Sequence, residues 1–444
     1  MYNFNFQFVD IIIIFCYFII IALLTWFTIS YDNRIRITFL LLISFLIKIF
    51  LGFFLNNNAI MALQHQYLLS EYDATNYYIQ SVYDVATQNS LLPELHWSVS
   101  DPGFNYLLYW IGKIYTFCFE GLSLSYFHFI YLLIFFHTII FLFIFIQLEK
   151  KHLLNKTVLV AFTAIFLFEP MMFRFSFSLE REIVVSFILL MFVVAFMDNN
   201  IWIMIFSSVL IVYFRDVYLY LIPTWIFSYV IFRKFFSARI FLFLFFILIT
   251  FSFIIHVLSS YLEDFEYLFF HHAHELESSG FGIIIWSSIY FVRVLSYSLL
   301  GFVAPVPVYP FFNNEFLTFY LLAFIQGLSS ISYLFFNSYI MYSLYQFDVI
   351  IKKKRLKIDN LYQTIYKAYI VIFISHLTFH GLIYNIRHRV QIIPGIIFVF
   401  LYILSLQHTN KELRSKMSMR KCFYISFMIV LSLNIFYIFL KILV

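Results

Sequence analysis

The first candidate for chemistry is a carboxylate that lies close to a long apolar run. Asp73 occurs in the sequence EYDATNYY, within a stretch, 56–103, that holds several acidic residues but no lysine or arginine. A carboxylate near a membrane surface can act as a general base that takes a proton from a hydroxyl group. Binding a metal ion or capping a helix are the alternatives. The letters DATNYYIQSVYDVA predict a short amphipathic helix that carries Tyr77.

Arginines form the second group of candidates, because six of them lie outside the basic loops. They are Arg174, Arg181, Arg215, Arg293, Arg387 and Arg389. The planar guanidinium group suits bidentate contact with phosphate, and the closely spaced Arg387 and Arg389 could grip a pyrophosphate. Snorkelling is one alternative. Pairing with a neighbouring carboxylate (Glu180, Glu182 or Asp216) is another.

Two groups of histidines are also candidates. The run HHAHE at 271–275 offers imidazole and carboxylate groups, which are zinc or manganese ligands. Its spacing matches no established metal motif, so solvated loop histidines are the alternative. His376 and His380 are four residues apart, which places them on one face of a helix. For these two we expect interhelical hydrogen bonds, and the lining of a substrate path is the alternative.

The composition defines the setting in which these side chains must be placed. Of the 444 residues, 63% are hydrophobic and only 11% are charged, whereas soluble domains carry about 25% charged residues. This excludes a soluble enzyme, a DNA-binding protein and a disordered chain. The net charge of +5 therefore indicates membrane orientation rather than a nucleic-acid partner.

A spanning helix needs about 20 mostly apolar residues. Candidate spans are 8–30, 37–55, 124–147, 157–173, 182–198, 201–214, 217–232, 240–258, 316–347, 362–384, 391–407 and 422–443. The segments 104–117 and 281–304 are apolar but harder to place. We therefore expect an all-α polytopic membrane bundle of about 11–13 transmembrane helices, folded as a single domain over 1–444.

Basic residues set the orientation, because short cytoplasmic loops are enriched in lysine and arginine. Five loops, near residues 34–36, 150–156, 233–239, 352–357 and 411–421, hold most of them and can all face the cytoplasm. The acidic region 56–123 then becomes a long outer, periplasmic-type loop with interfacial helices. The region 259–315 becomes a second outer loop with a re-entrant segment, which Pro305, Pro307 and Pro310 favour.

With these features in order, the chain resembles a group of bacterial polysaccharide polymerases. An outer loop with Asp73 and Tyr77 is followed by DPGFNYLL, which begins at Asp101, and later by Arg181-Glu182 at the start of a helix. This order resembles polymerases of the EpsG and Wzy (O-antigen polymerase) kind, and the early outer Asp resembles the broader GT-C glycosyltransferases. The segment RHRVQIIP at 387–394 is similar to the start of a late helix in that group.

The resemblance implies glycosyl transfer on the periplasmic face of a bacterial inner membrane. The donor would be a saccharide linked to undecaprenyl phosphate or pyrophosphate, bound by the six arginines, with Asp73 as the base. Sugar or acceptor contacts would come from the remaining candidates, Tyr77, Trp97, Asp101 and His274. The sequence identifies no cofactor, although a divalent metal ion is an open alternative. A chain-length regulator is an open alternative as a protein partner.

Three functions compete at this point. The first is the repeat-unit polymerase of an O-antigen or capsule. The second is a transferase that adds a single sugar from a monophosphate lipid carrier. The third, of another class, is a flippase for lipid-linked oligosaccharides, which Lys48 and Lys367 favour because they lie inside apolar runs.

Overall fold

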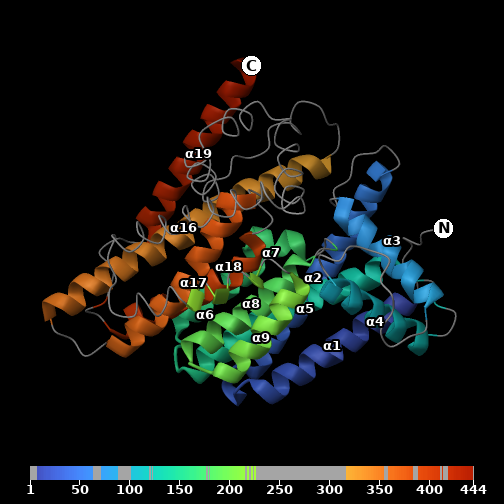
Figure 1. Ribbon diagram of the computed structural model, residues 1–444, viewed down its shortest axis with the longest axis horizontal. Coiled ribbons are helices and arrows are strands. Elements are labelled where there is room, and N and C mark those ends of the chain that lie inside the picture. Colours follow the sequence, from blue (N-terminus) through green and yellow to red (C-terminus); the bar gives the residue numbers. More distant parts are fainter. Residues whose placement is uncertain are drawn as a thin grey trace, which may run out of the picture. The chain divides into compact units, whose positions relative to one another are not determined.

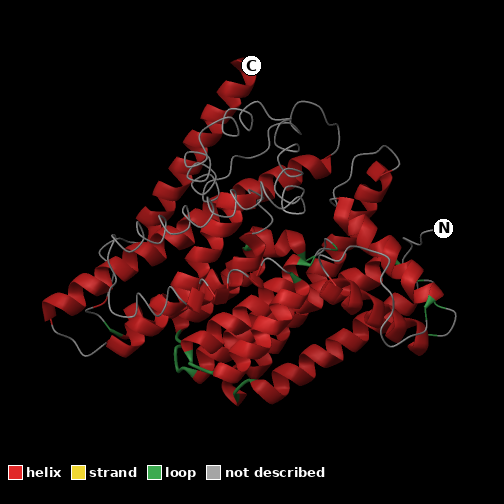
Figure 2. Cartoon of the chain, in the orientation of Figure 1, coloured by secondary structure: helices red, strands yellow, loops and turns green. Residues whose placement is uncertain are grey.

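The computed structural model describes most, but not all, of the chain. It describes residues 8–63, 72–88, 102–119, most of 122–226, 317–354, 359–383, 389–410 and 419–443. Every regular element assigned within these ranges is a helix (Figures 1 and 2). The described chain divides into two compact units, of which unit 1 is built mainly from residues before 220 and unit 2 from 326 onwards.

The helices of unit 1 begin and end close to the expected apolar runs. They are α1 (Phe8–Thr28), α2 (Tyr31–Leu63), α3 (Tyr72–Thr87), α4 (Pro102–Cys118), α5 (Tyr126–Lys150), α6 (Lys156–Phe168), α7 (Pro170–Phe175), α8 (Glu182–Met197) and α9 (Ile201–Phe214). Unit 2 contains most of α16 (Leu317–Lys354), together with α17 (Asp359–Ile383), α18 (Arg389–Thr409) and α19 (Met419–Leu443).

Four of the described helices are long and apolar enough to cross a membrane by themselves. They are Phe8–Thr28, Asp32–Phe53, Tyr126–Lys150 and Arg389–Thr409. Together with the helical content of the described chain, they define a helical membrane protein. The expected span 240–258, most of 217–232, and the segments 281–304 and 259–315 lie outside the described residues.

Contacts between helix ends and between ring pairs fix the directions of α1, α2, α5 and α6 in unit 1. The carboxylate of Glu149, at the end of α5, accepts hydrogen bonds from the backbone N–H (3.0 Å) and hydroxyl (2.5 Å) of Ser30, in the turn between α1 and α2. Phe141 packs on Phe166, and Phe145 packs on Phe162, so α6 returns antiparallel to α5. The turn at Ser30 and the end of α5 therefore lie at the same end of unit 1.

One expected span is interrupted. The apolar run 157–173 predicted a single helix, but the structure ends α6 at Phe168 and begins the short helix α7 at Pro170. Proline is favoured at the first position of a helix, where its missing N–H is not needed. The carboxylate of Glu169 accepts a hydrogen bond of 2.6 Å from the backbone N–H of Met172 and caps the new helix. The prediction was wrong because a Glu-Pro pair restarts the helix inside the apolar run.

The two amphipathic helices of the first long loop pack side by side (Figure 1). Gly112 of α4 faces Val85 of α3 so closely that a Cβ at Gly112 would lie 2.6 Å from Val85 Cγ2. The ammonium group of Lys113 donates a hydrogen bond of 2.7 Å to the carbonyl of Val85, in the last turn of α3. Lys113 thus satisfies a carbonyl that has no partner within the helix.

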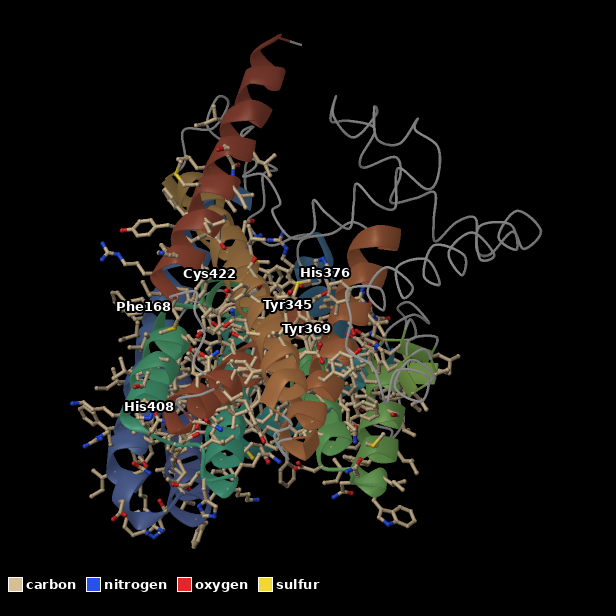
Figure 3. The ribbon with its side chains drawn as sticks, turned by 90° about the vertical axis from the view of Figure 1, so that its left-hand side faces the viewer. Phe168, Tyr345, Tyr369, His376, His408 and Cys422 are labelled. Atoms are coloured by element: carbon tan, nitrogen blue, oxygen red, sulfur yellow. The ribbon has the colours of Figure 1, made fainter. Side chains whose placement is uncertain are left out.

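Polar side chains join the helices of unit 2. The hydroxyl of Tyr339, on α16, donates a hydrogen bond of 2.6 Å to Gln407 on α18, and Tyr369, on α17, donates to Asn337 on α16 at 3.1 Å. Figure 3 labels Tyr369 and His376 on α17, and Cys422 on α19. The helix α18 begins at Arg389, earlier than the expected 391, so Pro394 lies beyond its first turn.

Candidate functional site

Unit 1 separates its basic loop residues from its other arginines. Arg34 and Arg36 at the start of α2, Lys150 and Lys151 at the end of α5, and Lys156 at the start of α6 lie at one end, which we name the Lys150 end. The opposite end holds the start of α8 and the end of α9, and we name it the Arg181 end. The helix α7 and the contacts of α3 described below also belong to the Arg181 end.

The Arg181 end is joined to the helix that carries Asp73. The guanidinium Nη1 of Arg181 donates a hydrogen bond of 3.1 Å to the hydroxyl of Tyr77, on α3. The ring of Tyr77 makes an edge contact with Phe104 at a centroid distance of 4.9 Å. Asp73 precedes Tyr77 by four residues on the same helix, so the two positions share a face. The structure therefore places the Asp73 position one turn from a residue that binds Arg181.

The position of Asp73 also bears on its role as a helix cap. The described helix α3 begins at Tyr72, so Asp73 lies inside the first turn rather than at the residue before the helix. A carboxylate in the first turn still interacts favourably with the positive end of the helix dipole. Asp84, three turns further along the helix, is buried and accepts a hydrogen bond of 3.0 Å from Gln80.

Arg215 is held in a buried ion pair. It follows the last residue of α9, is 4% exposed, and its Nη1 lies 3.5 Å from the Oε1 of Glu182 at the start of α8. The sequence offered Glu180 or Glu182 as partner for Arg181 and Asp216 as partner for Arg215, whereas the structure pairs Glu182 with Arg215. A buried pair of this kind fixes the ends of two helices relative to each other.

Arg174 is the third arginine at this end. It lies in the last turn of α7, and its guanidinium carbon lies 5.1 Å from the centre of the Phe175 ring. Its side chain is half-buried, as is that of Arg181, whereas Arg215 is enclosed. Arg174 and Arg181 therefore combine a fixed position with some exposure, which an anion-binding residue needs.

A buried acid–imidazole pair lies at the same end, and no sequence motif indicated it. The Oδ1 of Asp10 in α1 lies 3.2 Å from the Nε2 of His128 in α5, and both side chains are fully buried. The backbone N–H of Ser125 donates to the Nδ1 of His128 at 3.1 Å, so the imidazole proton sits on Nε2 and faces Asp10. The only signal was a lone carboxylate within an apolar run.

Tyrosines extend the contacts between these helices. Tyr78 of α3 donates a hydrogen bond of 3.0 Å to the carbonyl of Leu124, just before α5. Tyr126 of α5 accepts a hydrogen bond of 3.3 Å from the backbone N–H of Leu179. In α4, burial and the nearby carboxylate of Asp84 raise the pKa of Tyr109. The helix of Asp73 is thus tied to α5 as well as to Arg181.

Arg389 belongs to unit 2. It opens α18, is fully buried, and donates a hydrogen bond of 3.0 Å to the hydroxyl of Ser330 in α16. Its guanidinium carbon lies 5.0 Å from the centre of the Tyr333 ring. The hydroxyl of Tyr333 is hydrogen-bonded to the Nδ1 of His376 in α17 at 2.6 Å. The interhelical hydrogen bond expected for His376 is therefore present.

Several predicted site residues fall outside the described part of the chain. They are Trp97, Asp101, His274, Arg293 and Arg387, and the side chain of Asp73 is likewise not described. No group of His, Cys, Asp or Glu side chains that could hold a metal ion occurs among the described residues. The run at 271–275, which suggested a metal site, lies outside them.

The architecture defines a class, a helical membrane protein whose first unit carries its basic loop residues at one end and Arg174, Arg181 and Arg215 at the other. No protein-family model, curated protein or solved structure matches the chain.

Proposed function

We propose that this protein is a glycosyltransferase of the bacterial inner membrane that builds a surface polysaccharide. The reaction is repeat-unit polymerisation, in which glycan passes from undecaprenyl pyrophosphate to a sugar hydroxyl. The observation that carries the proposal is the hydrogen bond from Arg181 to Tyr77, because it joins the arginine end of unit 1 to the helix of Asp73. A general base and a phosphate-binding cation are what this reaction requires.

The orientation of unit 1 supports a site on the periplasmic face. Arg34, Arg36, Lys150, Lys151 and Lys156 lie at the Lys150 end, as cytoplasmic residues would under the positive-inside rule. Arg181 and the helix of Asp73 lie at the opposite end. Lipid-linked repeat units are joined outside the cytoplasm, so the site belongs at that end.

The proposed chemistry assigns one role to each group. Asp73 takes the proton from the acceptor hydroxyl, and the oxygen attacks the anomeric carbon of the donor. The bond from that carbon to the phosphate oxygen breaks, and undecaprenyl pyrophosphate leaves with the electron pair. Arg181 and Arg174 stabilise the negative charge that develops on the leaving group. Arg215, enclosed with Glu182, holds the end of α9 in place instead of binding phosphate.

The test compares two isosteric substitutions in a strain whose own copy of the gene is deleted. Asp73→Asn should reduce long-chain polysaccharide about 100-fold or more, because it removes the base. Glu71→Gln, two residues earlier in the same loop, is the matched control and should leave chain length unchanged. Both variants must reach the membrane at the level of the natural protein. Full-length polysaccharide in Asp73→Asn at that level would remove Asp73 as the base.

The same gels separate polymerisation from single-sugar transfer. Loss of the ladder after gene deletion supports the polymerase. An unchanged ladder with altered antibody recognition instead indicates transfer of one sugar from undecaprenyl phosphate.

A flippase for lipid-linked oligosaccharides is the second candidate, and one observation favours it. Lys48 is buried inside α2, one of the helices long enough to cross a membrane, and charges within a span often belong to transport paths. Accumulation of lipid-linked repeat units on the cytoplasmic side in the deletion strain would identify the flippase. Accumulation on the periplasmic side would identify the polymerase.

A further inference from the structure

Lys48 is the buried cation that the proposed reaction does not use. It lies past the middle of α2, is 1% exposed, and its ammonium group donates a hydrogen bond of 2.6 Å to the hydroxyl of Ser44. The same nitrogen lies 4.2 Å from the centre of the Phe166 ring. Among the described residues no carboxylate forms an ion pair with Lys48. An ammonium in such surroundings is costly and marks a functional site by default.

His137, on α5, packs against the same ring. Its imidazole is stacked on Phe166 at a centroid distance of 5.7 Å and lies 5.0 Å from Phe141. The side chain is 1% exposed, and its buried Nδ1 has no hydrogen-bond partner in the described part of the chain. His137 is near the middle of α5, which is also long enough to span a membrane. The two bases thus contact the same ring, that of Phe166, from two helices that are each long enough to span a membrane.

The other titratable groups around this enclosure are engaged elsewhere. From α1, Tyr17 is hydrogen-bonded to Tyr115 at 2.7 Å. From α5, His128 is paired with Asp10. After α6, the carboxylate of Glu169 accepts a hydrogen bond from the backbone N–H of Met172. Lys156 is the first residue of α6, at the end of that helix opposite to Phe166. Among the described residues, the ion pairs that these groups form do not include Lys48 or His137.

We propose that Lys48 and His137 together form a proton-binding site inside the membrane. Two neighbouring bases in a medium of low dielectric constant cannot both be charged, so the pair holds one proton at most. The faces of Phe166 and Phe141 stabilise a single cation, and the Ser44 hydroxyl accepts one of its hydrogen bonds. On release the proton passes to water, and the pair changes from a charge of +1 to zero.

This site does not depend on the identity of the reaction. A purely structural cation would be expected beside a carboxylate, and a purely apolar position would be filled as well by Met as by Lys. A group that gains and loses a proton within a span is a means by which a membrane protein responds to a proton gradient. The ligand of the site is therefore the proton itself.

The experiment measures the titration of His137 in the full chain. The protein is labelled with [15N]histidine and placed in lipid nanodiscs, and the His137 resonance is assigned from its absence in His137→Gln. Its chemical shift is followed from about pH 5 to pH 9, the range in which imidazole titrates. If the two bases share a proton, the midpoint in Lys48→Met should differ from that of the natural chain by more than about one pH unit. Identical curves, or a resonance that never moves in either protein, would overturn the proposal.

Lys48→Arg distinguishes a proton-exchanging amine from a fixed cation. Arginine keeps its charge at every pH used, so it cannot exchange a proton with His137. The proposal expects the His137 curve of Lys48→Arg to differ from that of the natural chain. If the two titration curves overlap, a fixed positive charge at position 48 is enough to set the titration of His137, and the proposed proton-binding site is wrong. Thermal unfolding of each variant in the same nanodiscs confirms that the compared proteins are folded.

Discussion

The guanidinium group of Arg181 donates a hydrogen bond of 3.1 Å to the hydroxyl of Tyr77, a residue 104 positions earlier in the chain. This bond joins the start of α8 to α3, and the ring of Tyr77 rests at the same time against Phe104 of α4. Tyr77 was a candidate sugar contact from its sequence. In the structure it has a second role, since its hydroxyl positions an arginine.

Tyr77→Phe separates these two roles. The variant keeps the ring that contacts Phe104 but removes one hydrogen-bond acceptor of Arg181, so the guanidinium group is held less firmly. A hydrogen bond to a half-exposed charged group contributes about 1 kcal/mol, and we expect about a fivefold loss of long-chain polysaccharide at unchanged protein abundance. Tyr345→Phe, the same change at a residue that is 58% exposed, is the control. Equal chain lengths in the two variants would argue against a positioning role for Tyr77.

Removing one member of the Arg215–Glu182 pair should destabilise the protein more than removing both. The two side chains are 5% and 2% exposed, so a single substitution takes the opposite charge of this pair away from a buried charged group. Arg215→Met and Glu182→Leu should each cost about 3–5 kcal/mol, whereas the double variant should recover most of this loss. Thermal unfolding of the two single variants and the double variant, each purified, measures their losses of stability.

Arg174→Met is the matched control for that series. Arg174 is half-buried and has its guanidinium group against Phe175, without the enclosed ion pair of Arg215. Its substitution should leave the unfolding temperature nearly unchanged. Strictly additive losses for Arg215→Met and Glu182→Leu would contradict the pairing.

The sequence was sufficient for several of the individual helices and for the sorting of charge between the two ends of unit 1. Apolar runs predicted α1, α5 and α9 to within a few residues, and the pattern after Asp73 predicted α3. Helical periodicity specifies which residues share a face, but it does not specify which helices are neighbours. The pairing of Asp10 with His128 follows only from the packing of α1 on α5, so no local pattern could reveal it.

The break between α6 and α7 was missed for a different reason. The average hydropathy over 157–173 is high enough to predict one continuous span. Within it, however, Glu169 and Pro170 end one helix and start the next. The choice of Glu182 as partner of Arg215 could not be predicted either, because 33 residues separate them and the nearer Asp216 is equally acidic. Long-range pairing of this kind is decided by tertiary structure.

Gly112→Ala should disturb the contact between α3 and α4. The added Cβ would lie 2.6 Å from Val85 Cγ2 and 3.3 Å from a methyl group of Leu124, so α3 must shift to accept it. Overpacking of this kind costs about 1–3 kcal/mol, and a shift of α3 also moves Tyr77 away from Arg181. We expect lower thermal stability together with shorter polysaccharide chains. Ile114→Ala, at a residue that is 51% exposed on the same helix, should have neither effect.

In unit 2, Tyr333 and His376 should behave as a coupled pair. Their hydrogen bond of 2.6 Å is buried and joins α16 to α17, while the ring of Tyr333 also lies beneath the guanidinium group of Arg389. Tyr333→Phe keeps the ring and loses only the hydroxyl, so it should cost about 1–2 kcal/mol. Tyr333→Leu also removes the ring beneath Arg389 and should cost more than Tyr333→Phe.

A double-mutant cycle tests this coupling directly. His376→Phe removes the same hydrogen bond from the other side, so the double variant Tyr333→Phe/His376→Phe should be little less stable than the worse single variant. Coupling energies between residues in contact are about 0.5–3 kcal/mol, and thermal unfolding of the four proteins in nanodiscs gives the value. Ser405→Ala, at a buried hydroxyl with no hydrogen-bond partner among the described residues, is the control and should combine additively with Tyr333→Phe. If the Tyr333 and His376 losses also add, the two side chains act independently, and Tyr333 must be held over Arg389 by packing alone.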